Sequence, residues 1–453
     1  MNKQFFGLLL AAGISATSQA ETLNLEQAID KAIATDPRIG EKQAFVERAR
    51  AQLQEAEGSD DLFITANAFV GISPGLDGGF FENDNCDPAN ECVSRDDRYT
   101  LDDGLSPWFN LQYGVVKPLH TFGKIENYSD AAKQNIQVKQ QDVRLQRGST
   151  ILDVKRAYYG HLTAKNTRLF LEDIKKRVDN SLETVQIWLE EDEGLATQSD
   201  KFALQSASAL AQSYIVKAVA LEKISLDGLK VLSGYAANET INLADEGVKP
   251  VPLPDVQLQE VQKKALAERP EMKQLEHGLQ ARRSLVKANQ AMKKPNLYAA
   301  VVGMASYSPM RDRLDNPHIY DPFNDVGTTP MVGMHWEWAG GVQNAKTKQA
   351  QAELNALVER NAFAQKGIPF QVAESYAQVH AHYEALKSLE KSARSARKWM
   401  IASYTDFEAG LIPVDKIVSA FQAYVLSYTD YLKTVYDYNM QVAQLEQVSG
   451  AYQ

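Results

Sequence analysis

Hydrophobic residues recur at spacings of three and four along most of the chain, and at a spacing of two in four short segments. The first spacing is typical of helices that pack against other helices, and the second is typical of strands with one apolar face. Between Pro118 and Pro250 there is no proline, and Ala, Leu, Lys, Gln, Glu and Ser dominate, as in long helices. The pattern predicts a mainly α protein with a small β part.

The predicted long helices carry a heptad pattern. The run from Gly123 to about Glu190 would be on the order of 100 Å long at ~1.5 Å per residue. The last helix has one apolar line formed by Ile417, Phe421, Tyr424, Tyr428, Tyr431, Val435, Tyr438, Val442 and Leu445. The helix before it repeats the spacing at Val372, Tyr376, Val379, Tyr383, Leu386, Ala393, Met400, Tyr404 and Phe407. This spacing predicts coiled-coil packing, and a second line at Val418, Val425 and Leu432 predicts contact with a further neighbour.

Four segments of about ten residues read as strands. Alternation is clear in 62–72, 108–117 and 331–338, and weaker in 297–307. Tilted strands of this length cross a bilayer, although strands of a soluble sandwich share the same period. Four aromatic residues near the predicted strand ends suit a girdle at the membrane interface: Trp108, Tyr307, Trp336 and Trp338. Four strands cannot close a barrel, so a membrane barrel would require several chains.

The chain also repeats itself. Leu25-Glu26-Gln27-Ala28 with Asp36-Pro37 returns 233 residues later as Leu258-Gln259-Glu260-Val261 with Arg269-Pro270. Glu193-Gly194-Leu195 returns only 216 residues later as Ala409-Gly410-Leu411. Each copy predicts a helix, a strand, a polar loop, a strand, and two long helices joined by a tight turn. We therefore expect a first structural repeat over 21–249 and a second over 250–453.

The first twenty residues predict a secretory signal peptide, 1–20. They carry one charge, at Lys3, an apolar run from Phe5 to Ile14, and a small-residue exit ending at Ala20. The residue directly after Ala20 is Glu21 and not a cysteine, so we expect an exported protein without an N-terminal lipid anchor. No later stretch of 18 or more apolar residues predicts a spanning helix, and the mean hydropathy is −0.36. The net charge of −10 argues against a nucleic-acid partner.

The two cysteines, Cys86 and Cys92, stand in a segment rich in Asp, Asn, Gly and Pro. In an oxidising compartment this spacing favours a small disulfide-closed loop, with two free thiols as the alternative. A metal pair is disfavoured because no His or second Cys pair lies nearby in the sequence. His380 and His382 are two residues apart on a predicted helix and point in different directions.

Sequence signatures of catalysis are absent. The chain has no Gly-x-Ser-x-Gly elbow, no phosphate-cradling loop, no His-Glu-x-x-His motif and no calcium-loop pattern. We therefore expect a protein that is not an enzyme, with no cofactor and no metal.

The chain resembles the TolC-like outer membrane efflux protein family over nearly all of its mature length. Three features carry the resemblance: the opening Leu23 to Ile29 with Asp36-Pro37, the strand-to-helix junctions 122–124 and 338–341, and the hairpin tips 193–200 and 408–415. The second tip is one residue shorter between its Gly and its Asp. The resemblance implies a homotrimer in which a 12-stranded transmembrane β-barrel, with four long strands from each chain, continues into a periplasmic α-barrel of coiled-coil helices.

The function implied by this resemblance is that of an exit duct in the outer membrane of a Gram-negative-type cell, extending into the periplasm. It would conduct small molecules from a tripartite efflux pump, with a periplasmic adaptor protein and an inner-membrane transporter as partners. One alternative is the outer-membrane duct of a type I protein secretion system. Another, from a different class, is a periplasmic coiled-coil scaffold without a pore.

The candidate site residues lie at the two hairpin tips. By resemblance, Gly194, Leu195, Gly410 and Leu411 contact the adaptor, and Asp200 and Asp415 ring the channel mouth. A structural explanation stands beside this one: Gly permits the positive φ that ends a helix, and an Asp near the start of the next helix interacts favourably with its dipole. Helix capping alone therefore accounts for the two acids equally well.

Overall fold

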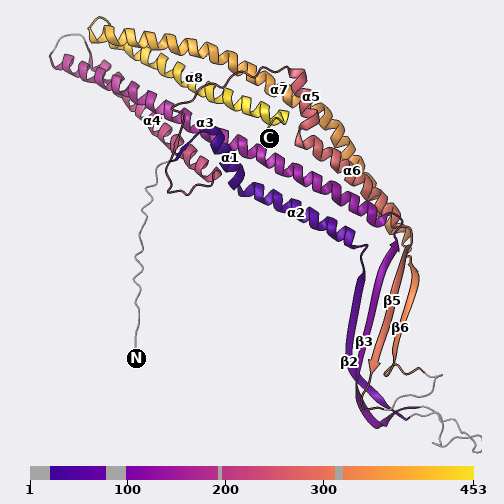
Figure 1. Ribbon diagram of the computed structural model, residues 1–453. Helices are drawn as coiled ribbons and strands as arrows, with labels where there is room; N and C mark the ends of the chain where they lie inside the picture. Colours follow the sequence, from indigo (N-terminus) through magenta and orange to yellow (C-terminus); the bar gives the residue numbers. More distant parts are fainter. Residues whose placement is uncertain (1–20, 78–97, 192–195, 312–319, 453) are drawn as a thin grey trace, which may run out of the picture. The chain divides into compact units, whose positions relative to one another are not determined.

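The computed structural model describes residues 21–77, 98–191, 196–311 and 320–452. Helices dominate this part of the chain, and the strands β2, β3, β5 and β6 lie side by side in one sheet (Figure 1). The predicted signal peptide, Cys86, Cys92, Gly194 and Leu195 lie outside the described residues.

The same order of elements occurs twice along the chain. The first run is α1 (Leu25–Thr35), α2 (Pro37–Gly58), β2 (Phe63–Asp77), β3 (Arg98–His120), α3 (Lys124–Glu190) and α4 (Gln198–Leu232). The second is α5 (Leu258–Glu268), α6 (Pro270–Ala291), β5 (Asn296–Tyr307), β6 (Val326–His335), α7 (Gly340–Glu408) and α8 (Val414–Ser449). Two three-residue strands that the sequence did not predict, β1 (Glu21–Leu23) and β4 (Ile241–Leu243), pair in parallel.

The first helix of each run breaks before a proline, at Pro37 and at Pro270. Asp36 and Arg269 have extended backbones, with ψ of 114° and 131°, because a residue that precedes proline is driven out of the helical region. The Asp36 carboxylate then accepts a hydrogen bond from the backbone N–H of Arg38, at 2.9 Å, in the first turn of α2. The break is thus both imposed by proline and stabilised by a side chain.

Close contacts divide the chain into two compact units, each built from both halves. The first comprises Met1–Ala44, Gln140–Lys273 and Ala362–Gln453, and we call it the helical unit. The second comprises Phe45–Lys139 and Gln274–Asn361, includes the four-stranded sheet, and is called the sheet unit.

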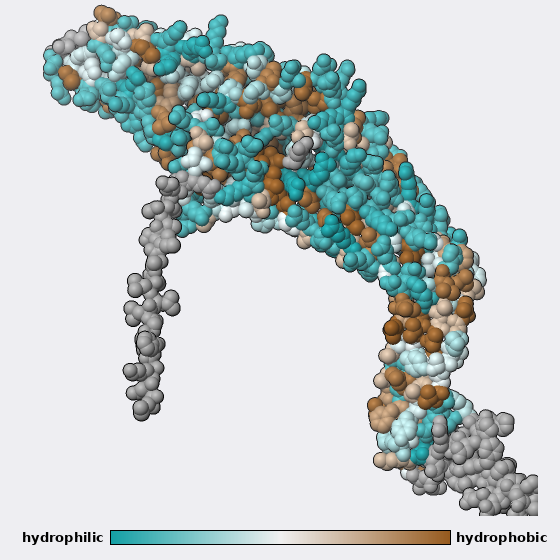
Figure 2. Space-filling model, viewed as in Figure 1, coloured by the Kyte–Doolittle hydropathy of each residue, from teal (hydrophilic) through white to brown (hydrophobic). Residues whose placement is uncertain are grey.

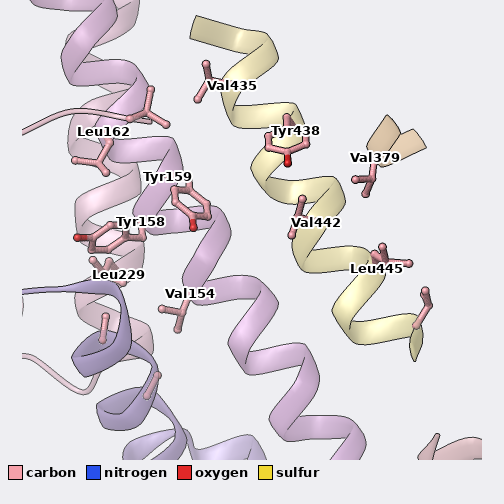
Figure 3. Packing of buried hydrophobic residues seen from close by; sticks show 14 of the residues in the cluster. Val154, Tyr158, Tyr159, Leu162, Leu229, Val379, Val435, Tyr438, Val442 and Leu445 are labelled. Carbon is pink, nitrogen blue, oxygen red and sulfur yellow. The ribbon is translucent and has the colours of Figure 1, made fainter. Parts of the chain in front are cut away.

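Heptad positions form the core of the helical unit. Figure 3 shows Tyr158 of α3 beside Leu229 of α4, and Tyr159 of α3 on the side that faces Tyr438 and Val442 of α8. Of the predicted apolar lines, the following members are buried: Val372, Val379, Leu386, Ala393, Met400 and Phe407 on α7, and Ile417, Phe421, Tyr424, Val435, Tyr438, Val442 and Leu445 on α8. The predicted packing between neighbouring helices is therefore confirmed.

A buried asparagine fixes the segment between the two runs. Asn439 of α8 is 1% exposed. Its side-chain amide donates to the carbonyl oxygen of Lys249 at 2.8 Å, and its carbonyl oxygen accepts from the N–H of Val251 at 2.9 Å. One side chain therefore satisfies both a donor and an acceptor of a backbone segment that has no regular partner of its own.

The sheet is antiparallel with the order β2-β3-β5-β6. Its register places the predicted apolar positions of β2, β3 and β6 together on one side, which we call the apolar face. These positions are Ile64, Ala66, Ala68, Val70 and Ile72; Phe109, Leu111, Tyr113 and Val115; and Val332 and Met334. The opposite face, which we call the polar face, carries Thr65, Asn67, Ser73, Asn110, Gln112, Ser306 and Thr329, together with the apolar residues Phe63, Phe69, Val116, Val302 and Met331.

Trp108 departs from the predicted aromatic girdle. It pairs with Gly71 and so lies on the polar face, where its ring packs against Phe323 at a centroid distance of 5.5 Å. Trp336 and Trp338 lie beyond the end of β6, and they and Tyr307 are exposed. Because side chains alternate along a strand, Trp108 lies on the face opposite to Phe109. Trp108 therefore does not belong with the other three residues of the predicted aromatic girdle.

Candidate functional site

The α7–α8 turn presents one exposed leucine. Gly410 adopts a φ of +71°, and the backbone N–H groups of Gly410 and Leu411 donate to the carbonyl oxygens of Phe407 and Asp406 at 2.8 and 2.9 Å. These bonds end α7 in the manner predicted for a glycine at this position. Leu411 is 74% exposed, whereas Val414, three residues later, is buried. The backbone therefore holds Leu411 outward while its neighbour anchors the turn.

The α3–α4 turn begins its second helix with a reciprocal cap. Thr197 is the N-cap of α4, and the carboxylate of Asp200 accepts from the Thr197 N–H at 2.9 Å and from its hydroxyl at 2.7 Å. The Asp200 N–H in turn donates to the Thr197 hydroxyl oxygen at 3.3 Å. Asp200 is therefore engaged in capping in this chain.

Asp415 is placed differently. It is exposed in the first turn of α8, whose N-cap, Pro413, makes no side-chain cap, and it forms an ion pair of 3.4 Å with Lys416. The two candidate acids thus have different surroundings, and only Asp200 has the reciprocal capping bonds.

Among the described residues of 183–201 and 399–416, which surround the two hairpin tips, acidic side chains outnumber basic ones. The acids are Glu183, Glu190, Glu191, Asp200, Asp406, Glu408 and Asp415, and the bases are Lys201 and Lys416. Only Asp200 and Asp415 among these acids were predicted from the sequence. The described residues of both tips belong to the helical unit.

An apolar layer joins the two hairpins just behind their tips. Trp188 of α3 packs against Phe407 of α7 at a centroid distance of 5.1 Å. Phe407 is fully buried, as are Val185, Leu204 and Ile417, so all four long helices contribute to this layer. Movement of one hairpin relative to the other would have to disrupt this packing.

A groove of about 1230 Å³ lies between α3, α4 and α8. The predicted second apolar line of α8 contributes Val418 and Val425 to its lining. On α4 the lining includes the exposed residues Leu221, Ile224 and Val231. This α4 face was not predicted, although Leu210, Tyr214, Leu221, Ile224 and Val231 follow a heptad spacing that could have indicated it.

The largest pKa shifts accompany helix packing. Burial, together with the nearby carboxylates of Glu446 and Asp245, raises the pKa of Tyr159 to about 12. Burial also raises the pKa of Tyr158, whose hydroxyl donates to Asp245 at 2.7 Å. Within the described ranges, no group of three or more His, Cys, Asp or Glu side chains is placed to hold a metal ion. Nor does any described helix combine the length and apolarity needed to cross a membrane.

One family model matches part of the chain. Residues 261–451 match the model of the family described as outer membrane efflux protein. No curated protein sequence matches the chain.

Solved structures with the same fold extend over almost the whole chain. A membrane protein from Pseudomonas aeruginosa superposes with a TM-score of 0.74 at 16% identity, covering 96% of this chain and 91% of that one. The outer membrane protein VceC from Vibrio cholerae gives 0.74 at 13% identity, with coverages of 94% and 96%. The CmeC outer membrane channel from Campylobacter jejuni gives 0.75 at 12% identity, with coverages of 94% and 85%.

Proposed function

We propose that this chain is a member of the TolC-like outer membrane efflux protein family and forms an outer-membrane efflux duct. The duct would be a homotrimer, and it would conduct small molecules that a tripartite pump delivers. The observation that carries the proposal is the two-sided sheet. Val70, Ile72 and Val332 on the apolar face are each more than 60% exposed, while the opposite face is mixed and carries most of the polar side chains of the sheet beside Phe63, Phe69 and Met331. Figure 2 shows hydrophobic residues at the surface over the strands. A sheet of this kind suits lipid on one side and water on the other.

The edges of the sheet support closure by three copies. Strands β2 and β6 each have a neighbour on one side only, which leaves a row of backbone donors and acceptors that lipid cannot satisfy. Three chains of four strands would close a 12-stranded barrel without a free edge. The exposed apolar lining of the groove on α4 and α8 offers a further surface for a second copy in a helical barrel.

The repeated order of elements supports an internal duplication. We infer two structural repeats, over 21–249 and 250–453, that follow a signal peptide at 1–20. Helices from both repeats would then alternate around the periplasmic barrel.

The hairpin tips are the proposed docking points for a periplasmic adaptor, which would link the duct to an inner-membrane transporter. Gly410 and Leu411, with Gly194 and Leu195 of the other tip, would make this contact. The exposed Leu411 favours an apolar pocket on the adaptor, and the acidic surroundings favour a basic rim. Of the two candidate aperture acids, Asp415 is the better placed to line the mouth, because the Asp200 carboxylate is used in its cap.

Charge introduction at the tips tests this assignment. In cells that depend on the protein for export of a small toxic dye, Leu195→Glu with Leu411→Glu should abolish export while trimers still form in the outer membrane. Ser199→Glu is the matched control, because it adds a carboxylate in the first turn of α4, where the helix dipole favours it, and leaves both leucines in place. Normal export by the double variant would disprove the tip assignment. If the double variant loses the secretion of a protein and not the export of the dye, the chain forms the duct of a type I secretion system.

A further inference from the structure

The described residues of the β5–β6 connection, 308–311 and 320–325, lie against the polar face of the sheet. Phe323 of the connection packs against Trp108 of β3. Tyr320 contacts Met304 of β5, whose Sδ atom accepts a hydrogen bond from the tyrosine hydroxyl at 3.3 Å. Met304 pairs with Gln112 and Gly327 and therefore also lies on the polar face. Two separate contacts thus place residues 320–323 against the same side of the sheet.

A cluster of hydroxyl groups fastens the connection at its start. The Ser308 hydroxyl lies 2.7 Å from that of Ser73 and donates to that of Ser106 at 2.9 Å. The N–H of Met310 donates to the Ser106 hydroxyl at 3.0 Å, and the N–H of Ser308 donates to the side-chain oxygen of Asn324 at 2.8 Å. These bonds tie the connection to β2 and β3 as well as to its own second half.

Burial at this end of the sheet is one-sided. Ser73, Ser106 and Ser308 are at most 2% exposed, although they are small polar residues at the end of a sheet. Ile72, adjacent to Ser73 but on the apolar face, is 67% exposed. Hydroxyls are shielded in this way only where other residues cover them, so the covering lies on the polar face alone.

A buried ion pair joins the two described parts of the connection, 308–311 and 320–325. The guanidinium of Arg311 binds the carboxylate of Asp321 at 2.9 Å, and their side chains are 0% and 6% exposed. The same carboxylate oxygen accepts from the N–H of Phe323 at 3.1 Å, and the guanidinium lies 5.0 Å from the centre of the Phe323 ring. Removal of one partner would leave a buried charge uncompensated, which is strongly unfavourable. The flanks are therefore held together at one point.

We propose that residues 308–311 and 320–325 form a second, outer constriction of the duct, with Tyr320 in contact with passing solute. The inference rests on the proposed function, because the polar face becomes the inner wall only if the apolar face meets lipid in a closed barrel. Three copies of the segment would then narrow the same level of the pore. Tyr320 is 59% exposed, so its ring would project into the passage and limit the size of solute that the outer end admits.

Cysteine modification tests this placement. The parent protein would carry Cys86→Ser and Cys92→Ser, so that the introduced cysteine is the only one. Tyr320→Cys is compared with Val326→Cys, which is also exposed but lies on the apolar face. Purified trimers in a planar bilayer receive a bulky, charged, membrane-impermeant thiol reagent on the outer side. We expect a loss of single-channel current for Tyr320→Cys and unchanged current for Val326→Cys.

The other outcomes are decisive in different ways. If the parent conducts but the current of Tyr320→Cys is unchanged, the proposed constriction is wrong and the proposed duct still stands. The same conclusion follows if mass spectrometry shows that the thiol of Tyr320→Cys is not modified. A trimeric, membrane-inserted parent that never conducts contradicts the duct itself. As an independent check, Phe323→Ala should raise the current and admit larger solutes, and an unchanged size limit would again overturn the constriction.

Discussion

The ring of Tyr113 in β3 lies over Gly303, its cross-strand partner in β5. The tyrosine hydroxyl continues to the side chain of Thr328 in β6, so one side chain spans three strands. A Cβ atom at Gly303 would meet the end of the tyrosine ring and would lie 2.6 Å from the backbone oxygen of Gly327. Tyr298 covers Gly333 in the same way on the opposite face. Aromatic residues that cover glycines in this way fix the register of a sheet.

Gly303→Ala should destabilise the sheet by about 1–3 kcal/mol, because the added methyl overpacks a site where the backbone oxygen cannot move away. Heat-induced dissociation of the purified trimer is the measurement. Gly327→Ala is the matched control, since its Cβ would meet no atom closer than 3.9 Å. Equal stability of the two variants would show that the tyrosine does not fill this site.

Asp36 makes stability depend on pH. Its side chain is 4% exposed, and burial raises its pKa, but hydrogen bonds from Arg38 and Thr150 outweigh burial and leave the pKa below the usual value. The stabilisation is therefore complete above pH ~4, the unfolded pKa, and is lost as the pH falls through the folded pKa.

Asp36→Asn should lower the free energy of unfolding at pH 7 by about 1.5–3 kcal/mol, the range for hydrogen bonds to a charged group. The difference from the wild type should shrink as the pH falls below ~4, because the wild-type carboxyl then loses its charge. Urea unfolding at several pH values measures this. Asp30→Asn, on an exposed position of α1, should give no such trend.

Asn439→Ala should release the segment between the two runs. The substitution leaves the Lys249 carbonyl and the Val251 N–H without their side-chain partner, at about 1–3 kcal/mol for each group that water does not reach. We expect faster proteolytic cleavage within 244–257. Lys433→Ala, at an exposed position of the same helix, should leave the cleavage rate unchanged, and resistance of both variants would contradict the assigned role.

Phe407→Ala should loosen the layer that joins the hairpins behind their tips. Removal of this fully buried ring, which packs against Trp188, costs about 3–5 kcal/mol in a core that cannot collapse. We expect a higher open probability in bilayer recordings. Phe363→Ala removes the same ring from an exposed position of α7 and should leave gating unchanged.

The helical core was predictable because coiled-coil packing is a local, repeating relationship. Val372, Val379 and Val435 are buried for the same reason that their spacing predicted, and Pro37 fixes its break through its immediate neighbour. The pairing of β1 with β4 was not predictable, because three-residue strands far apart in sequence carry no periodic signal.

Features that depend on strand register or on loop geometry could not be predicted from the sequence either. The face on which Trp108 lies could have been read from its alternation with Phe109, but its packing against Phe323 depends on the fold. Arg311, Asp321 and the three serines near them read as ordinary polar loop residues until the fold brings them together. The candidate tip residues were recognised by resemblance, and the structure added the difference between the engaged Asp200 and the exposed Asp415.

Single-channel recording tests the central claim most directly. Purified, trimeric wild-type protein and the Phe407→Ala variant would each be inserted into a planar bilayer. We predict stepwise currents, with longer openings in the variant. Silence from both proteins, after insertion and trimer formation have been verified, would contradict the account and favour a scaffold without a pore.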